Sequence, residues 1–135
     1  MLEGVLIPIV SDQDIVAARQ SGRAMAAKLG FSATDQICIA TAISELSRNI
    51  VEYAKEGEIQ LAPCRARDNG RAGIQIVARD KGPGIPDISL ALKDGYSTSR
   101  SLGLGLPGTR RLMDDFEIVS DPGKGTAVTI RKWLR

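Results

Sequence analysis

Glu45 and Asn49 are the first pair of side chains whose types and spacing suit a chemical role. They are four positions apart in a segment with helical periodicity, so their side chains are neighbours on one helix face. A carboxylate beside a carboxamide suits Mg²⁺, which keeps several of its waters and shares the phosphate oxygens of a substrate. A solvated helix face has the same pattern, and the pair alone favours that simpler interpretation.

The motif Asp80-Lys81-Gly82-Pro83-Gly84 comes directly after a predicted strand. An ionised aspartate only accepts hydrogen bonds, and at a strand end it can accept one from an exocyclic amine. Gly82 and Gly84 would let the backbone approach a flat ring closely. An ordinary turn often has the same D-x-G pattern, so this motif alone is also weak.

Residues 103–108 read Gly-Leu-Gly-Leu-Pro-Gly and lead into a predicted helix. Free amides at that helix N-terminus, with its positive dipole end, would hold a phosphate chain. A dinucleotide fingerprint should follow the first strand of a parallel unit, whereas this segment follows a polar loop late in the chain. No P-loop pattern occurs, and a flexible connector is the alternative. The last strand opens with Gly125-Thr126, where the Thr126 hydroxyl can reach the same pocket.

The composition excludes several classes of function. The chain has 135 residues, no histidine, two cysteines and a net charge of +2. Without histidine there is no imidazole triad and no common zinc site. Cys38 and Cys64 form no CxxC motif, which fits a reducing cytosol. The interspersed charges predict no nucleic-acid surface, and no segment has the length of a membrane span or the pattern of a signal peptide. We expect one cytoplasmic domain over residues 1–135.

Two helices are expected in the first half of the chain, and the second one carries Glu45 and Asn49. One begins after Ser11 with an S-x-x-D start and stops at Gly30, and a second begins after Ser32 and runs to about Ala54. The second helix has a predicted apolar stripe made of Ile37, Ala40, Ile43, Ser47, Ile50 and Ala54. Its predicted polar face carries Thr41, Glu45, Arg48, Asn49 and Glu52.

The remaining elements predict a sheet. Strands are expected over residues 4–10, 58–63, 73–79, 117–120 and 126–133, and residues 94–105 are expected to form a loop. A short helix with Pro107 near its start should turn five residues inward, which are Leu106, Thr109, Leu112, Met113 and Phe116. The order β-α-α-β-β-α-β-β predicts an α+β, two-layer sandwich with all helices on one face of a mostly antiparallel mixed sheet.

Taken in order, these motifs resemble the GHKL ATPase superfamily, whose ATP-binding unit is the Bergerat fold. The shared features are E-x-x-x-N on a helix, D-x-G-x-G after a strand, a Gly-rich lid before a helix and a terminal G-T. The resemblance implies that Asp80 binds the adenine amine, that Asn49 coordinates Mg²⁺ and that Thr126 supports the adenine end. The other ATP-binding residues that it implies are Gly82, Gly84, Gly103, Leu104, Gly105 and Leu106.

Longer segments resemble the RsbT-type switch kinases of the bacterial stressosome. These segments are DIVAARQ, TAISELSRNI, DKGPGIPDI, DGYSTSRSLGLGLPG and the final KWLR. The resemblance implies phosphorylation of a serine or threonine on STAS-domain scaffold and antagonist proteins. It also implies that the released kinase activates a PP2C-type phosphatase. Kinase relatives often dimerise, so a homodimer is compatible with the resemblance, but the sequence alone does not reveal the oligomeric state.

Phosphoryl transfer needs positioning, charge neutralisation and an oriented hydroxyl. Glu45 is the candidate to accept the proton of that hydroxyl, and Arg100 and Ser101 in the lid are candidates to reach the γ-phosphate. Two other functions remain open. A nucleotide-gated binding module would have the same pocket without needing Glu45, and an anti-sigma factor would bind a sigma subunit directly.

Overall fold

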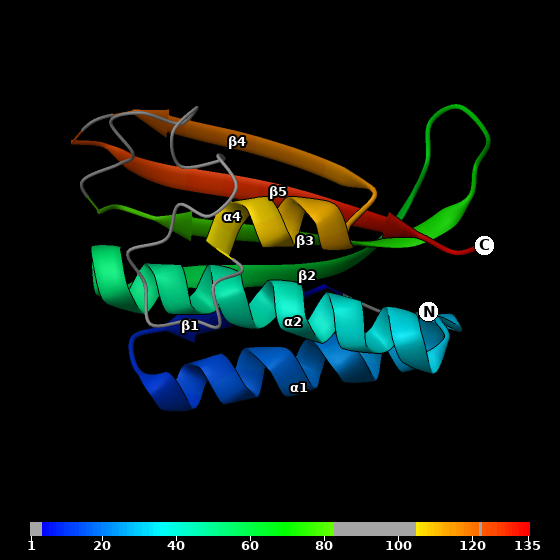
Figure 1. The fold of residues 1–135 in the computed structure, drawn as a ribbon, viewed down its shortest axis with the longest axis horizontal. Helices are drawn as coiled ribbons and strands as arrows, with labels where there is room; N and C mark the ends of the chain where they lie inside the picture. The colour runs from blue at the N-terminus through cyan, green and yellow to red at the C-terminus, as the bar shows by residue number, and fades with distance from the viewer. Residues whose placement is uncertain (1–3, 83–104, 122) are drawn as a thin grey trace.

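The fold is a five-stranded sheet covered by helices on one face (Figure 1). The computed structural model describes residues 4–82, 105–121 and 123–135. Every strand pair in this part of the chain is antiparallel, and the strands lie in the order β1-β2-β3-β5-β4. The strands are β1 (Val5–Ile9), β2 (Gly57–Arg65), β3 (Ala72–Asp80), β4 (Asp115–Asp121) and β5 (Gly125–Trp133). The helices are α1 (Asp12–Leu29), α2 (Ala33–Asn49), the π-helical turn η1 (Ile50–Ala54) and α4 (Gly105–Leu112).

This arrangement confirms the predicted two-layer α+β sandwich and the predicted order of elements. β2, β3, β4 and β5 are longer than expected, because backbone pairing continues beyond the residues whose side chains alternate clearly, whereas β1 is one residue shorter at each end. None of the described helices combines the length and apolar content needed to cross a membrane.

Local signals set the ends of the two long helices, as the sequence predicts. The Asp14 carboxylate accepts hydrogen bonds from the Val10 and Ser11 amides at 2.9 and 3.1 Å. Gly30 ends α1 in the left-handed conformation, with φ of 100°. The Ser32 hydroxyl oxygen accepts a hydrogen bond from the Asp35 amide at 3.1 Å. The contacts of the Ser11 and Asp35 amides satisfy backbone groups that a helix start leaves without a partner.

The core lies between α2 and the sheet. Alternate residues of β3 face the helices, and Ile74, Ile76 and Ala78 are buried there as predicted. From α2 and η1 the core receives Ile39, Ile43, Leu46 and Ile50, all almost fully buried. Burying a side chain of this size contributes roughly 1.5–3 kcal/mol, so α2 is held mainly by packing on the sheet.

The predicted polar and apolar faces of α2 are partly wrong. Ile37, assigned to the apolar stripe, is 54% exposed. Glu45, assigned to the polar face, is buried, as are Ile39 and Leu46 outside the predicted stripe. The reason is that α2 contacts α1 and α4 as well as the sheet, so the buried arc is much wider than one stripe.

Two smaller corrections concern the ends of helices. The second helix does reach Ala54, but its last turn has the π-helical geometry of η1. Phe116, expected to face inward from the short helix, belongs to β4 and is half-buried. The inward positions Leu106, Thr109 and Met113 are buried as predicted.

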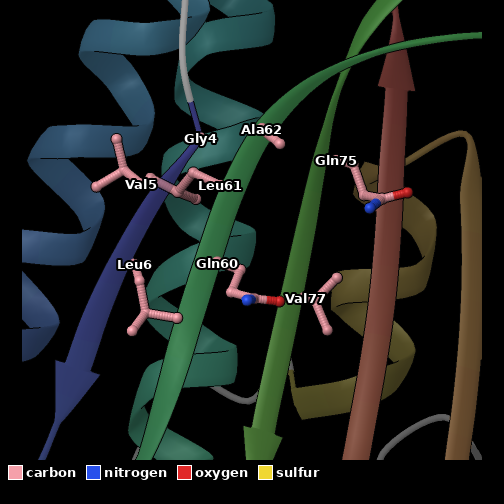
Figure 2. Close-up of a pocket in the computed structure, with 8 residues that line it drawn as sticks. All are labelled: Gly4, Val5, Leu6, Gln60, Leu61, Ala62, Gln75 and Val77. Carbon is pink, nitrogen blue, oxygen red and sulfur yellow. The ribbon is translucent and has the colours of Figure 1, made fainter.

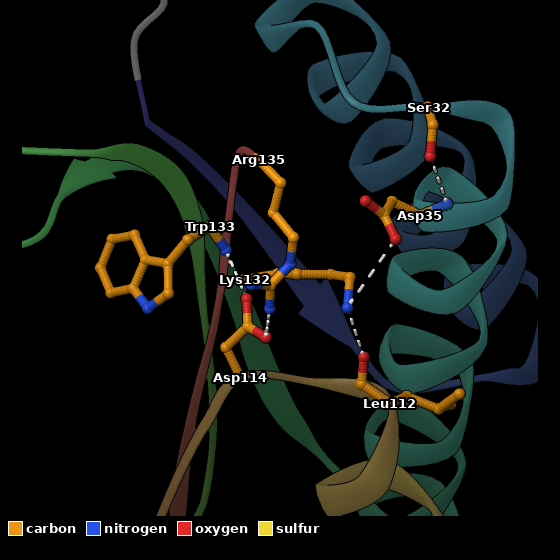
Figure 3. A network of polar contacts seen from close by, with 7 residues as sticks. All are labelled: Ser32, Asp35, Leu112, Asp114, Lys132, Trp133 and Arg135. Carbon is orange, nitrogen blue, oxygen red and sulfur yellow. Dashed lines mark hydrogen bonds and ion pairs between the residues drawn. The ribbon is translucent and has the colours of Figure 1, made fainter.

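A polar network joins the C-terminal strand to two helices (Figure 3). The buried Lys132 ammonium donates a hydrogen bond to the Leu112 carbonyl at the end of α4 at 2.9 Å. It also lies 3.9 Å from the Asp35 carboxylate in the first turn of α2. Nearby, Asp114 accepts a hydrogen bond from the Trp133 amide at 2.8 Å and pairs with Arg135. The C-terminal strand is therefore tied to the end of α4 and to the first turn of α2.

The face of the sheet without helices carries a depression of about 330 Å³ (Figure 2). It is lined by parts of β1, β2 and β3 together with Gly4, and the lining residues are Gly4, Val5, Leu6, Gln60, Leu61, Ala62, Gln75 and Val77. None of the site residues predicted from the sequence lines it. The depression is therefore separate from the candidate site described next.

Candidate functional site

Glu45 and Asn49 lie in the last turns of α2, one helical turn apart. Asn49 is the last residue of α2 and is half-buried. The Glu45 side chain is only 3% exposed, and its Oε1 accepts a hydrogen bond from Nη1 of Arg48 at 3.2 Å. Its Oε2 is buried and has no hydrogen-bond partner in the described part of the chain. A buried polar atom without a partner is costly, which makes this oxygen a candidate to accept a ligand's hydrogen bond.

Asp80 ends β3 on the helix-covered face of the sheet, and β5 brings Thr126 directly opposite it. The Asp80 Oδ1 accepts a hydrogen bond from the Gly82 amide at 2.9 Å, which orients the carboxylate. The Thr126 hydroxyl lies 2.9 Å from the Ser120 hydroxyl of β4. Three polar side chains therefore line one edge of the helix-facing surface, which suits recognition of a flat polar ring.

Two glycines allow the end of α2 to pack closely against the end of β3. A Cβ at Gly57 would lie 2.9 Å from Cγ2 of Ile50 and 2.4 Å from the Arg79 carbonyl oxygen. A Cβ at Gly82 would lie 2.6 Å from the Ala54 Cβ. Distances this short do not occur for real side chains, so larger residues at either position would push η1 off the sheet. The close contact brings the end of α2, with Asn49, towards Asp80.

Gly125 allows a similarly close approach of β5 to Asp80 from the other side. Its φ is 103°, in the left-handed region that glycine adopts most easily. A Cβ there would lie 2.1 Å from the Asp80 carbonyl oxygen. The strand that carries Thr126 can therefore approach Asp80 only because residue 125 has no side chain.

The structure describes only part of the predicted phosphate-binding segment. Gly105 and Leu106 are the first two residues of α4, which packs against α2. Leu106 and Thr109 are buried, so α4 is held firmly beside the helix that carries Glu45. The N-terminus of such a helix favours anions. The remaining predicted positions, which are Gly84, Arg100, Ser101, Gly103 and Leu104, lie outside the described residues.

The candidate metal ligand in the described part of the site is the Asn49 carboxamide at the end of α2. Within residues 4–82, 105–121 and 123–135, no group of three or more cysteine, aspartate or glutamate side chains could hold a metal ion. One carboxamide, at Asn49, suits an ion that takes its other ligands from phosphates and water.

Neither cysteine is among the candidate site residues, and Cys64 lies near the opposite end of β2 from Gly57. Both are free thiols. Burial raises the pKa of the Cys64 thiol, with Arg131 lowering it and Asp115 raising it. A thiol with a raised pKa is a poor nucleophile.

Arg48 and Ser120 are functional candidates that only the structure reveals. Arg48 belongs to the predicted polar face of α2, and its position three residues after Glu45 is a recognisable ion-pair spacing. Ser120 could not have been found from spacing, because its contact with Thr126 depends on the register of β4 and β5.

Comparison with known proteins gives the family and close relatives. The chain matches the family described as "Histidine kinase-like ATPase domain" over residues 10–132. It is 52% identical over 129 residues to the serine/threonine-protein kinase RsbT of Bacillus subtilis (strain 168), with 96% of each chain covered. It is 32% identical over 120 residues to the anti-sigma F factor of Thermoanaerobacter sp. (strain X514), covering 87% of this chain and 83% of that relative.

Solved structures share the fold at lower identity. The crystal structure of the RsbU and RsbW domains of a Mycobacterium tuberculosis protein matches with a TM-score of 0.66 and 23% identity, covering 98% of this chain and 32% of that one. The mycobacterial sensor histidine kinase MprB matches with a TM-score of 0.55 and 15% identity, covering 99% of this chain and 100% of that one. These likenesses confirm the predicted fold.

We predict that Gly125→Ala destabilises the fold and disturbs Asp80, because the new Cβ collides with a backbone oxygen. The left-handed φ costs about 1–2 kcal/mol, and overpacking adds about 1–3 kcal/mol. Urea denaturation measures the loss. Gly123→Ala is the matched control, since it has a φ of 79° but open space around a Cβ, so only the first cost should appear. Equal losses in the two variants would contradict the close contact.

Proposed function

Because this chain belongs to the histidine kinase-like ATPase family and is an RsbT-type serine/threonine-protein kinase, we propose that it phosphorylates STAS-domain scaffold and antagonist proteins. The phosphoryl group comes from ATP, and the acceptor is a serine or threonine. The observation that carries this proposal is the buried Glu45 carboxylate, which has one oxygen without a partner in the described structure, one helical turn from Asn49. A pocket that only senses nucleotide does not need such a group.

Asp80 and its neighbours supply adenine recognition in this proposal. Oδ1 of Asp80 is held by the Gly82 amide, which leaves Oδ2 to accept a hydrogen bond from the adenine amine. The paired hydroxyls of Thr126 and Ser120 lie beside it. Guanine has a carbonyl where adenine has this amine, so the wrong base would leave buried polar groups unpaired.

Asn49 and α4 hold the phosphates. The Asn49 carboxamide is the proposed protein ligand of Mg²⁺, and the N-terminus of α4 at Gly105 receives phosphate oxygens. When bound, Mg²⁺ neutralises charge on the phosphates. α4 is held in place by packing on α2 and by Lys132 at its other end.

Glu45 acts on the acceptor hydroxyl. Its Oε2 accepts the proton while the hydroxyl oxygen forms a bond to the γ-phosphorus. The bond from that phosphorus to the bridging oxygen breaks, and ADP leaves with the electron pair. A base placed in this way typically contributes about 10²–10⁴-fold in rate.

The downstream role rests on the resemblance of the sequence motifs to the RsbT-type switch kinases. We propose that the kinase, once released from its scaffold, activates a PP2C-type phosphatase. A cytoplasmic location and a homodimer also remain predictions. The similarity to an anti-sigma F factor supports a second candidate, an anti-sigma factor that binds a sigma subunit directly. The identity of 52% to the kinase, against 32% to the anti-sigma factor, favours the first.

We predict that Asp80→Asn weakens ATP binding and reduces the preference for ATP over GTP, because the anionic acceptor of the adenine amine is lost. Calorimetric titration with both nucleotides measures this. Asp68→Asn, at an exposed turn position, should bind like the wild type. Equal affinity of the wild-type protein for ATP and GTP would rule out the proposed role of Asp80.

We predict that Asn49→Ala weakens ATP binding in the presence of Mg²⁺ by up to several kcal/mol, since the ion loses its protein ligand. The fold should survive, because Asn49 lies outside the buried core. Titration in Mg²⁺ and in EDTA separates the effects. The variant and the wild type should bind ATP alike in EDTA, and an equal loss in both conditions would contradict a role through the metal.

We predict that Glu45→Gln leaves ATP affinity nearly unchanged and lowers phosphotransfer to a STAS-domain protein about 10²–10⁴-fold. Glutamine keeps the size of the side chain and removes the base. Transfer of labelled phosphate is the measurement, with Glu56→Gln, at an exposed position outside the site, as control. A Gln variant with the wild-type rate would exclude Glu45 as base. A wild-type protein that transfers no phosphate would favour a binding module or anti-sigma factor.

A further inference from the structure

Arg48 is the described residue that pairs with the Glu45 carboxylate. Its Nη1 lies 3.2 Å from Oε1, and the two side chains are 32% and 3% exposed. The guanidinium therefore reaches from the partly exposed side of α2 to a carboxylate that is almost completely buried. No contact of Arg48 with Oε2 is present in this part of the chain.

The contact between Arg48 and Glu45 involves only one of the two carboxylate oxygens, Oε1. A hydrogen bond to one oxygen fixes the orientation of the carboxylate plane and leaves the other oxygen with its lone pairs directed elsewhere. An ionised carboxylate that is buried without a cation is strongly unfavourable. Arg48 thus provides both the charge and the orientation that Glu45 needs.

We propose that Arg48 is a positioning residue for phosphoryl transfer, which acts by pairing with Oε1 of Glu45 and so directing Oε2 towards the acceptor hydroxyl. This inference rests on the proposed function of Glu45 as the base. Arg48 itself touches neither the nucleotide nor the acceptor. Its loss therefore lowers kcat, while the affinity for ATP and the KM for the protein substrate stay close to their wild-type values.

A double-mutant cycle tests this role. Arg48→Met removes the guanidinium and keeps an unbranched stem, and it should lower kcat about 10- to 100-fold, the size expected for a hydrogen bond to a charged group. Arg48→Lys keeps the charge and one donor, so it should restore part of the rate. In the Glu45→Gln background, Arg48→Met should change kcat less than about threefold, because residues that act as one unit are not additive.

Arg79→Met is the matched control. It removes another guanidinium from an ion pair, 3.9 Å from Glu58 on the helix-free face of the sheet. Its kcat should equal the wild-type value. Thermal unfolding and ATP titration accompany each variant, so a rate loss caused by misfolding is recognised by a lower melting temperature together with weaker ATP binding.

Three outcomes would overturn the inference. A wild-type kcat for Arg48→Met would show that Glu45 needs no partner. A loss of ATP affinity as large as the loss of kcat would make Arg48 a nucleotide contact. An equal effect of Arg48→Met with and without Glu45 would show that it acts independently. If the wild-type protein transfers no phosphate, the proposed function itself fails. That failure is seen in the wild-type protein, whereas failure of the Arg48 inference is seen only in the variants of an active kinase.

Discussion

The structure depends on the close contact between the end of α2 and the end of β3. Gly57 and Gly82 permit this contact, since a side chain at either position would collide with η1. Gly125 permits the corresponding approach of β5 from the other side. Without these three contacts, Glu45 and Asn49 on α2 and Asp80 on β3, all candidate site residues, would belong to separate surfaces. Backbone proximity, rather than any single strong interaction, assembles the site.

Burial explains why Glu45 stands out chemically. α2 is enclosed by the sheet, α1 and α4. Glu45 is therefore almost fully buried, although it belongs to the polar face that the sequence predicts for α2. One carboxylate oxygen is paired with Arg48, and the other has no partner in the described structure. Such an arrangement costs stability, and residues that break the rules of stable packing often belong to functional sites. The Lys132 network at the opposite end of α4 keeps the enclosing helix in place.

Much of the fold could be predicted, because its signals are local. The starts of α1 and α2 follow from Asp14 and Ser32, and the end of α1 follows from Gly30. Alternating residues in β3 identified the buried face of the strand. The exposure of Ile37 and the burial of Glu45 were missed, because periodicity describes one helix and does not say how many elements surround it. Pairing between Thr126 and Ser120 was missed because it depends on strand register.

The sequence by itself determined the order of elements, the two ends of α1, the start of α2 and the chemical types available at each motif, since each of these depends on neighbouring residues. It also identified Glu45, Asn49 and Asp80 as candidates through their spacing and order. Only the tertiary structure decided that Asp80 lies opposite Thr126 and that Arg48 holds one oxygen of Glu45. The reason is physical. Strand order and the environment of a helix arise from contacts between distant segments, where the shape and volume of the partners decide which side chains meet.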